Sequence, residues 1–119
     1  MAAVSDSQAA DLAGAAAEWN MDVVYEVHDG AELARVAALS PRLVGVNNRN
    51  LRTFETSLET TRALIADVPE HALLISESGI NTATDIASLM ADGVGGFLVG
   101  ESLMRQNDVT AATRALLAI

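Results

Sequence analysis

The chain has 119 residues, half of them apolar, and its sixteen carboxylates against seven basic residues give a net charge of -9. This length favours one compact domain, expected over residues 1–119, and the acidic balance disfavours a nucleic-acid partner, whose phosphates call for a basic surface. The lack of cysteine excludes disulfides and thiolate chemistry, and the lack of lysine excludes a Schiff base or a lysine acid from this chain.

Hydropathy along the chain indicates a soluble protein. No segment approaches the roughly 20 apolar residues needed to span a bilayer. The first residues have neither the basic nor the apolar region of an export signal. We therefore expect a cytoplasmic protein without a membrane partner.

The first part of the chain alternates between helical and strand patterns. An alanine-rich segment with apolar residues at helical spacing opens with polar residues suited to a cap, and a β-branched run later breaks at Asp29-Gly30. A second helical segment stops at Ser40-Pro41. In order, these patterns predict a helix over 5–19, a strand over 22–28, a helix over 31–39 and a strand over 43–47.

The rest of the chain repeats the same alternation. A polar loop runs to about Ser57, and Pro69 closes the helix that follows it. The predicted elements are a helix over 58–68, a strand over 72–76, a helix over 82–92, a strand over 96–99, a short helical turn over 102–105 and a helix over 108–117. Such alternation implies parallel strands joined by right-handed helical crossovers. Either a doubly wound sheet or part of a βα barrel satisfies it.

Polar residues stand at the end of every predicted strand. They are Glu26 and His28 on the first, Asn47 and Arg49 at the second, Glu77-Ser78-Gly79 on the third, and Gly100-Glu101-Ser102 on the fourth. Because the carboxyl ends of parallel strands form the ligand-binding rim of such folds, we expect these groups to lie together. A single carboxylate there is often only a helix cap, but two glutamates at matching positions favour a functional site.

Strand alternation places apolar residues one step below this rim. The expected pairs are Val24 under Glu26, Gly45 under Asn47, Ile75 under Glu77 and Leu98 under Gly100. One face of the sheet is therefore predicted to be apolar below and polar at its upper edge.

The two histidines do not suggest a metal site. His28 is interpreted as a structural hydrogen-bonding residue next to Asp29, and His71 begins a different strand. With no cysteine to join them, no metal is expected.

The turns after the last two strands favour phosphate binding. Ser78-Gly79 and Gly100-Glu101 offer backbone N–H groups beside small residues, so an anion can approach closely. Glycines also simply make turns, but the loops after the last two strands are where barrel enzymes hold phosphate.

Four segments together resemble the carboxyl-terminal half of indole-3-glycerol-phosphate synthase, a βα-barrel enzyme of tryptophan biosynthesis. They are EVHDGAEL (26–33), LVGVNNRNLRTFETSLETT (43–61), LLISESGI (73–80) and FLVGESLMR (97–105). The resemblance implies half of a TIM (βα)8 barrel, strands five to eight, as a (βα)4 unit preceded by a helix. An alternative is that the chain belongs to another phosphate-binding barrel family of amino-acid biosynthesis. That alternative would account for the phosphate-binding turns but not for the NNRN segment at residues 47–50.

The resemblance also implies a reaction and a role for each rim residue. The family ring-closes and decarboxylates 1-(2-carboxyphenylamino)-1-deoxyribulose 5-phosphate, without a cofactor. The implied roles are Glu26 as general base, Asn47 as positioning residue, Glu77 as hydroxyl-binding carboxylate, Arg49 as the group that reaches the carboxylate-bearing ring, and Ser78, Gly79, Gly100 and Glu101 as the phosphate cradle. The family's acid-catalyst lysines belong to the other half of the barrel. We therefore expect no activity from the chain alone.

Half a barrel leaves strand edges and an apolar sheet face uncovered, so we also expect association. The alternatives are a homodimer or larger assembly that closes the barrel, and a flavodoxin-like rearrangement whose helices cover both faces.

Overall fold

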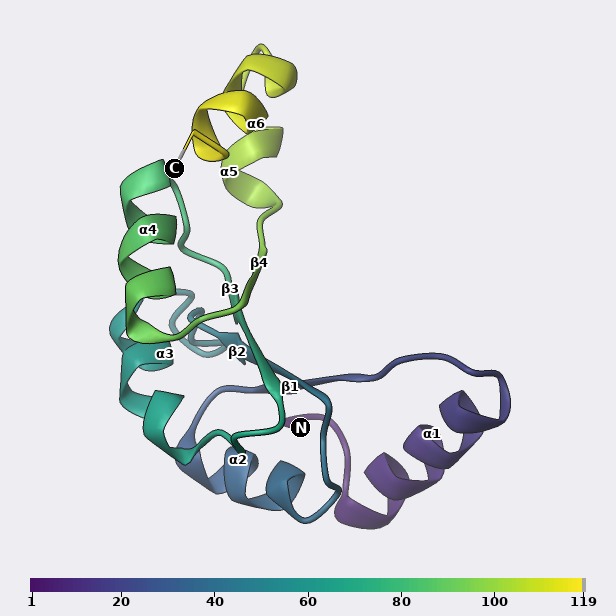
Figure 1. Ribbon diagram of the computed structural model, residues 1–119. Helices are drawn as coiled ribbons and strands as arrows, with labels where there is room; N and C mark the ends of the chain where they lie inside the picture. The colour runs from purple at the N-terminus through teal and green to yellow at the C-terminus, as the bar shows by residue number, and fades with distance from the viewer. Residues whose placement is uncertain (119) are drawn as a thin grey trace.

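The computed structural model describes residues 1–118 and shows four parallel strands that alternate with helices (Figure 1). The strands are β1 (Val24–Val27), β2 (Leu43–Asn47), β3 (Leu73–Glu77) and β4 (Gly96–Leu98). They pair in sequence order, β1-β2-β3-β4. A doubly wound sheet reverses its strand order at a switch point, and this sheet has no reversal. Successive right-handed crossovers then place the helices on one side, so the sheet is not flavodoxin-like.

Seven helical segments accompany the strands within residues 1–118. They are α1 (Asp6–Glu18), α2 (Gly30–Ala37), α3 (Glu59–Leu64), the 3₁₀ turn η1 (Ile65–Asp67), α4 (Ala83–Asp92), α5 (Glu101–Met104) and α6 (Val109–Leu116). The predicted alternation is confirmed, with ends that shift by a few residues. The largest difference is the helix expected over 58–68, which tightens into η1 because Pro69 forces Val68 into an extended conformation.

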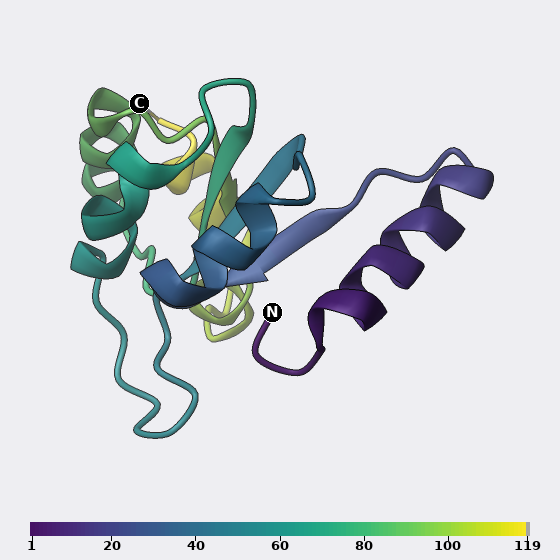
Figure 2. The same cartoon turned by 90° about the horizontal axis from the view of Figure 1, so that it is seen from below.

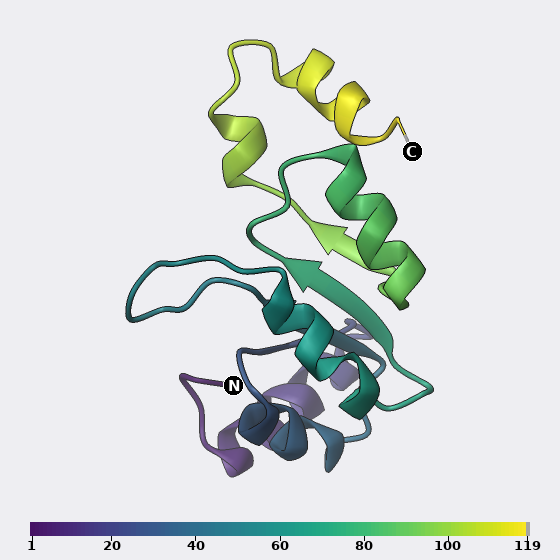
Figure 3. The same cartoon turned by 90° about the vertical axis from the view of Figure 1, so that its left-hand side faces the viewer.

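The helices form an outer layer along one side of the sheet. α2, α3 and α4 lie against that side, while α1 and the α5–α6 pair continue the arc at its two ends (Figure 1). Figure 2 shows α1 standing away from the strands, and Figure 3 looks onto the helical layer. The sheet is therefore convex toward the helices and open on its concave face.

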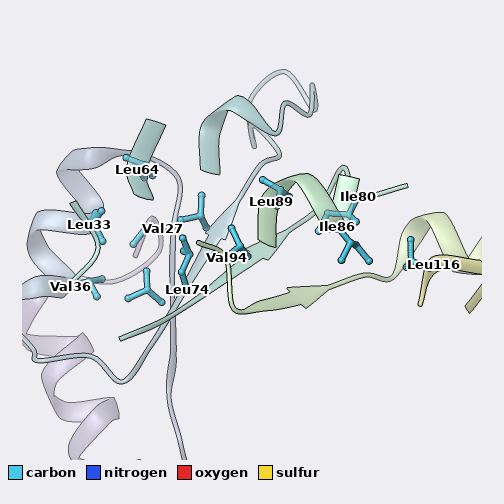
Figure 4. Close-up of a cluster of buried hydrophobic side chains, with 12 residues drawn as sticks. Val27, Leu33, Val36, Leu64, Leu74, Ile80, Ile86, Leu89, Val94 and Leu116 are labelled. Carbon is cyan, nitrogen blue, oxygen red and sulfur yellow. The ribbon is translucent and has the colours of Figure 1, made fainter. Parts of the chain in front are cut away.

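The hydrophobic core fills the space between the convex face and the helices (Figure 4). The core residues of the strands are Val27, Val44, Val46 and Leu74, and those of the helices are Leu33, Val36, Leu64, Ile86, Leu89 and Leu116. Strand side chains alternate between faces, so the strand residues on either side of each core residue point to the concave face. Val24, Leu73 and Leu98 are exposed there.

Candidate active site

Strand register arranges the concave face in three rows. The lowest row is Val24, Leu43 and Leu73, the next is Glu26, Gly45, Ile75 and Gly96, and the upper row is Asn47, Glu77 and Leu98. The lowest row is apolar and polar groups occupy the upper rows, as alternation predicts. Leu98 differs from the expectation, because it stands level with Glu77 at the rim and not a step below it.

Glu26 and Glu77 form an acidic pair on this face. The Glu77 side chain extends over Gly45, the register partner of Glu26, and Glu77 is only 5% exposed. Burial, together with the Glu26 carboxylate beside it, raises the pKa of Glu77 to about 7, against an opposing contribution from His28. Near neutral pH Glu77 therefore interconverts between acid and base, which suits a group that exchanges protons or binds hydroxyls.

Asn47 links the acidic pair to the loop that follows β2. Its Nδ2 lies 3.4 Å from Oε1 of Glu26, and its Oδ1 accepts a hydrogen bond of 3.0 Å from the backbone N–H of Arg49. The side-chain amide is thereby oriented with its donor end toward Glu26. This places both Asn47 and the start of the Arg49 loop in a fixed relation to that carboxylate.

Arg49 lies at the centre of a charged cluster on the rim. Its guanidinium donates to the carboxylate of Glu101 and lies 5.9 Å from the centre of the Phe54 ring. Glu101 also accepts from Arg105, one helical turn along α5. A planar guanidinium held in this way is suited to a carboxylate or phosphate ligand, which would compete with Glu101 for it.

The turn after β3 has two consecutive residues in the left-handed region. Ser78 has a φ of 65° and Gly79 a φ of 74°. The carbonyl of Ser78 accepts from Asn48 Nδ2 at 3.1 Å, and that of Gly79 accepts from Asn81 Nδ2 at 3.0 Å. With both carbonyls engaged by asparagines, the turn is held from two sides, and an αL residue is part of the backbone shape that forms anion-binding concavities.

Asn48 is the hub of a buried polar network behind the rim. Its Nδ2 donates to Ser76 Oγ at 2.9 Å, and its Oδ1 accepts from the Thr61 hydroxyl at 2.8 Å. Thr61 and Ser76 lie 2.8 Å apart, and all three residues are buried. The network joins the end of β2, the start of α3 and the end of β3.

One cavity of about 680 Å³ collects most of the predicted binding residues. Its lining includes Arg49, Glu77, Ser78, Gly79, Gly100 and Glu101, together with Arg105, Phe54 and Thr56. Asn47 lines a neighbouring cavity that Arg49 shares, and Glu26 joins the group through Asn47 and Glu77. The predicted residues therefore converge on one rim.

Sequence reasoning missed two contributors to the site, Asn48 and Arg105. His28, interpreted as a structural hydrogen-bonding residue, contacts Glu32 and Glu26, while its neighbour Asp29 caps α2. Asn48 could have been recognised from alternation, since it must face the opposite side from Asn47. Arg105 could have been recognised from its i,i+4 spacing to Glu101.

Residues 1–118 contain neither a membrane-spanning helix nor a metal-ligand cluster. None of the helices there is both long and apolar enough to cross a membrane. Within the same residues, His, Asp and Glu form no cluster of three or more that could hold a metal ion.

Comparison with known proteins places the chain in a family. The sequence model of "Indole-3-glycerol phosphate synthase" matches residues 1–116. The chain belongs to the indole-3-glycerol phosphate synthase family. The synthase of Azospirillum brasilense is 52% identical over 118 residues, covering 99% of this chain and 45% of the relative. That of Rhodopirellula baltica is 49% identical over 115 residues, covering 97% of this chain and 44% of the relative.

The chain thus spans about half the length of the synthases it matches. Among solved structures, the "Amycolatopsis orientalis BexX/CysO complex" is similar with a TM-score of 0.64 at 20% identity, covering 96% of this chain and 49% of that one. This likeness concerns the fold alone. The sheet order, the one-sided helical layer and the half coverage agree with half of a TIM barrel.

Proposed function

We propose that this chain supplies one half of an indole-3-glycerol phosphate synthase active site. The reaction is ring closure and decarboxylation of 1-(2-carboxyphenylamino)-1-deoxyribulose 5-phosphate to indole-3-glycerol phosphate, carbon dioxide and water. The observation that carries this proposal is the convergence of Glu26, Asn47 and Glu77 with Arg49 on one rim, in a chain that matches the family over residues 1–116.

The acidic pair and Asn47 serve the reacting atoms. Glu26 is the general base, and the Asn47 amide orients its carboxylate. Glu77, poised near neutral pH between its two protonation states, binds a substrate hydroxyl and can give or take a proton there. Arg49 exchanges its contact with Glu101 for the carboxylate of the substrate ring.

The turns after β3 and β4 bind the substrate phosphate. Ser78 and Gly79 offer a backbone turn held by two asparagines, and Gly100 and Glu101 face the same cavity. The Glu101 carboxylate is turned toward Arg49 and Arg105, so its charge is balanced and its backbone N–H is the part that serves the phosphate. Arg105 also lines this cavity and adds a positive charge there.

The isolated chain should have no measurable synthase activity. Carbonyl attack in this family needs a general acid from lysines that this chain does not contain. Losing a general acid typically costs on the order of 10²- to 10⁴-fold in rate. The second wall of the pocket is also supplied by the other half of the barrel.

Complementation tests this proposal directly. The chain would be co-expressed with the part of the Azospirillum brasilense synthase that precedes the matched segment, and product formation followed by indole fluorescence. Activity should appear in the mixture and be lost with Glu26→Gln. Activity of the chain alone would contradict the proposed dependence on the other half, and an inactive complex of the two folded halves would contradict the site assignment.

A second proposal concerns assembly. Val24, Leu73 and Leu98 are exposed apolar residues on the concave face, and exposed apolar surface favours association with a second copy in the absence of the other half. Sedimentation at increasing concentration should show a dimer or larger species. A monomer at all concentrations would contradict self-association.

A further inference from the structure

His28 lies between two carboxylates on different elements. Its Nδ1 is 3.1 Å from Oε2 of Glu32, and its backbone N–H donates to the same oxygen at 2.9 Å. Its Nε2 is 3.4 Å from Oε1 of Glu26. The side chains of His28 and Glu32 are only 15% and 14% exposed, so both are largely withdrawn from water.

The contact with Glu32 determines how the imidazole carries its proton. An ionised carboxylate only accepts hydrogen bonds, so a neutral His28 must place its proton on Nδ1. Nε2 then presents a lone pair toward Glu26. Nε2 is buried and has no partner with hydrogen-bond geometry in the described part of the chain.

The unprotonated Nε2 of His28 and the ionised Oε1 of Glu26 repel each other across 3.4 Å, and one added proton removes this repulsion. The proton can reside on Nε2, which gives an imidazolium beside a carboxylate, or on Oε1, which gives a carboxylic acid that donates to Nε2. Both forms contain the same number of protons. Contacts of catalytic groups are often long without substrate and shorten in the reacting complex.

We propose that His28 is a positioning residue for Glu26, fixed by Glu32 so that Nε2 and Oε1 share one proton. This inference rests on the proposed role of Glu26 as the general base. The shared proton is the one that Glu26 takes from substrate, and neither Oε1 nor Nε2 is protonated before that step. The O–H bond at Oε1 then breaks, its electron pair stays on the carboxylate, and the proton forms the N–H bond at Nε2. Glu26 is again ionised, and Glu32 faces the resulting imidazolium.

Other charged groups lie near Glu32, His28 and Glu26. Glu77 acts on Glu26 from β3. The cavity that His28 lines is also lined by the charged residues Asp29, Glu32, Arg49, Arg52 and Glu55. None of these stands within ion-pair distance of His28 except Glu32, in the described residues. Glu32 and Glu26 are therefore the two partners whose removal tests the inference.

The sequence provides its own control, because His28 and the exposed His71 are its two histidines. Ring ¹⁵N spectra of this chain under mildly alkaline conditions should show His28 with its proton on Nδ1 and His71 as a mixture of tautomers. Glu32→Ala should convert His28 to the mixture shown by His71. The matched variant Glu70→Ala, beside His71, should leave His28 unchanged. Identical tautomer signals for the two histidines in the unsubstituted chain would overturn the proposal.

A second measurement tests the shared proton itself. At a fixed pH, His28→Gln should shift the side-chain ¹³C signal of Glu26, and Glu26→Gln should shift the Nε2 signal of His28. If neither substitution moves the other residue's signal, the sharing is refuted. Because neither readout needs turnover, a failed complementation assay would refute the proposed function without affecting this result.

Discussion

The carboxylate of Glu77 occupies the space that a side chain at Gly45 would fill. A Cβ built at position 45 would overlap Oε1 of Glu77 and lie 3.1 Å from Val24 Cγ1. Gly45 is in an ordinary strand, so its role here is to provide room and not conformational freedom. The glycine allows Glu77 to be buried beside Glu26, and this burial raises the pKa of Glu77.

Gly45→Ala should therefore displace the Glu77 carboxylate toward water. The pKa of Glu77, read from its side-chain ¹³C signal, should fall from about 7 toward its ordinary value of 4.5. Gly14→Ala is the matched control, since nothing lies within 4 Å of a Cβ there and α1 should gain about 0.5–1 kcal/mol from the better helix former. An unchanged pKa of Glu77 in Gly45→Ala would show that the carboxylate has another way to stay buried.

Glu77 should also make stability depend on pH. Its pKa is higher in the folded chain than when unfolded, so between about pH 4.5 and 7 the folded state binds more protons and stability falls as pH rises. Glu77→Gln should remove this contribution. The free energy of unfolding of the variant should exceed that of the unsubstituted chain by on the order of 2 kcal/mol at pH 8, but by little at pH 4.5. Urea unfolding of both proteins at the two pH values measures the difference. A gain that is equal at both pH values would point to packing and not to ionisation.

The Asn47-Asn48 pair shows how far the sequence could predict this site. The alternation of strand and helix located the rim, because the carboxyl ends of parallel strands must meet. Asn47 can be recognised because it ends a strand, whereas Asn48 is recognised only by applying alternation one residue further, which turns it toward the helices. Its partners Thr61 and Ser76 look like ordinary helix and strand residues until their buried contacts are known.

Other relationships depend on register and could not be read from the sequence. Gly45 lies beside Glu26 only because β1 and β2 pair as they do, and Arg49 reaches Glu101 across 52 positions of the chain. The choice between a doubly wound sheet and a barrel half was also open, because alternation fixes parallel crossovers but not the order of strands.

The Asn48 network should make a large contribution to stability. Asn48→Ala leaves the Thr61 backbone N–H and the Ser78 carbonyl without their partner, while the Thr61 and Ser76 hydroxyls keep only each other, and each buried unsatisfied group costs about 1–3 kcal/mol. We expect a total loss of roughly 2–4 kcal/mol in urea unfolding. The exposed Asn107→Ala should lose less than about 0.5 kcal/mol. Equal losses in the two variants would mean that water replaces the network.

Glu101 should restrain anion binding at the rim. Its carboxylate engages both Arg49 and Arg105, so Glu101→Gln leaves two guanidinium groups less neutralised while keeping the backbone N–H. Binding of inorganic phosphate, followed by ³¹P NMR, should tighten by roughly three- to tenfold, or about 1 kcal/mol. Glu59→Gln, which pairs with Arg62 away from this cavity, is the control. Weaker binding by Glu101→Gln would show that Glu101 organises the cradle more than it competes with the ligand.

Leu98 should decide whether the concave face drives self-association. It is 62% exposed at the rim end of β4, in the upper row beside Glu77. Leu98→Glu places a charge on this face, next to an acidic pair, so a second copy would have to bury it. Sedimentation should show the assembled fraction of the unsubstituted chain shifting to monomer, with unchanged helical content by circular dichroism. Met90→Glu, at a residue 50% exposed on α4 outside this face, should leave assembly unchanged. If both variants dissociate the assembly, the helical layer and not the concave face forms the contact.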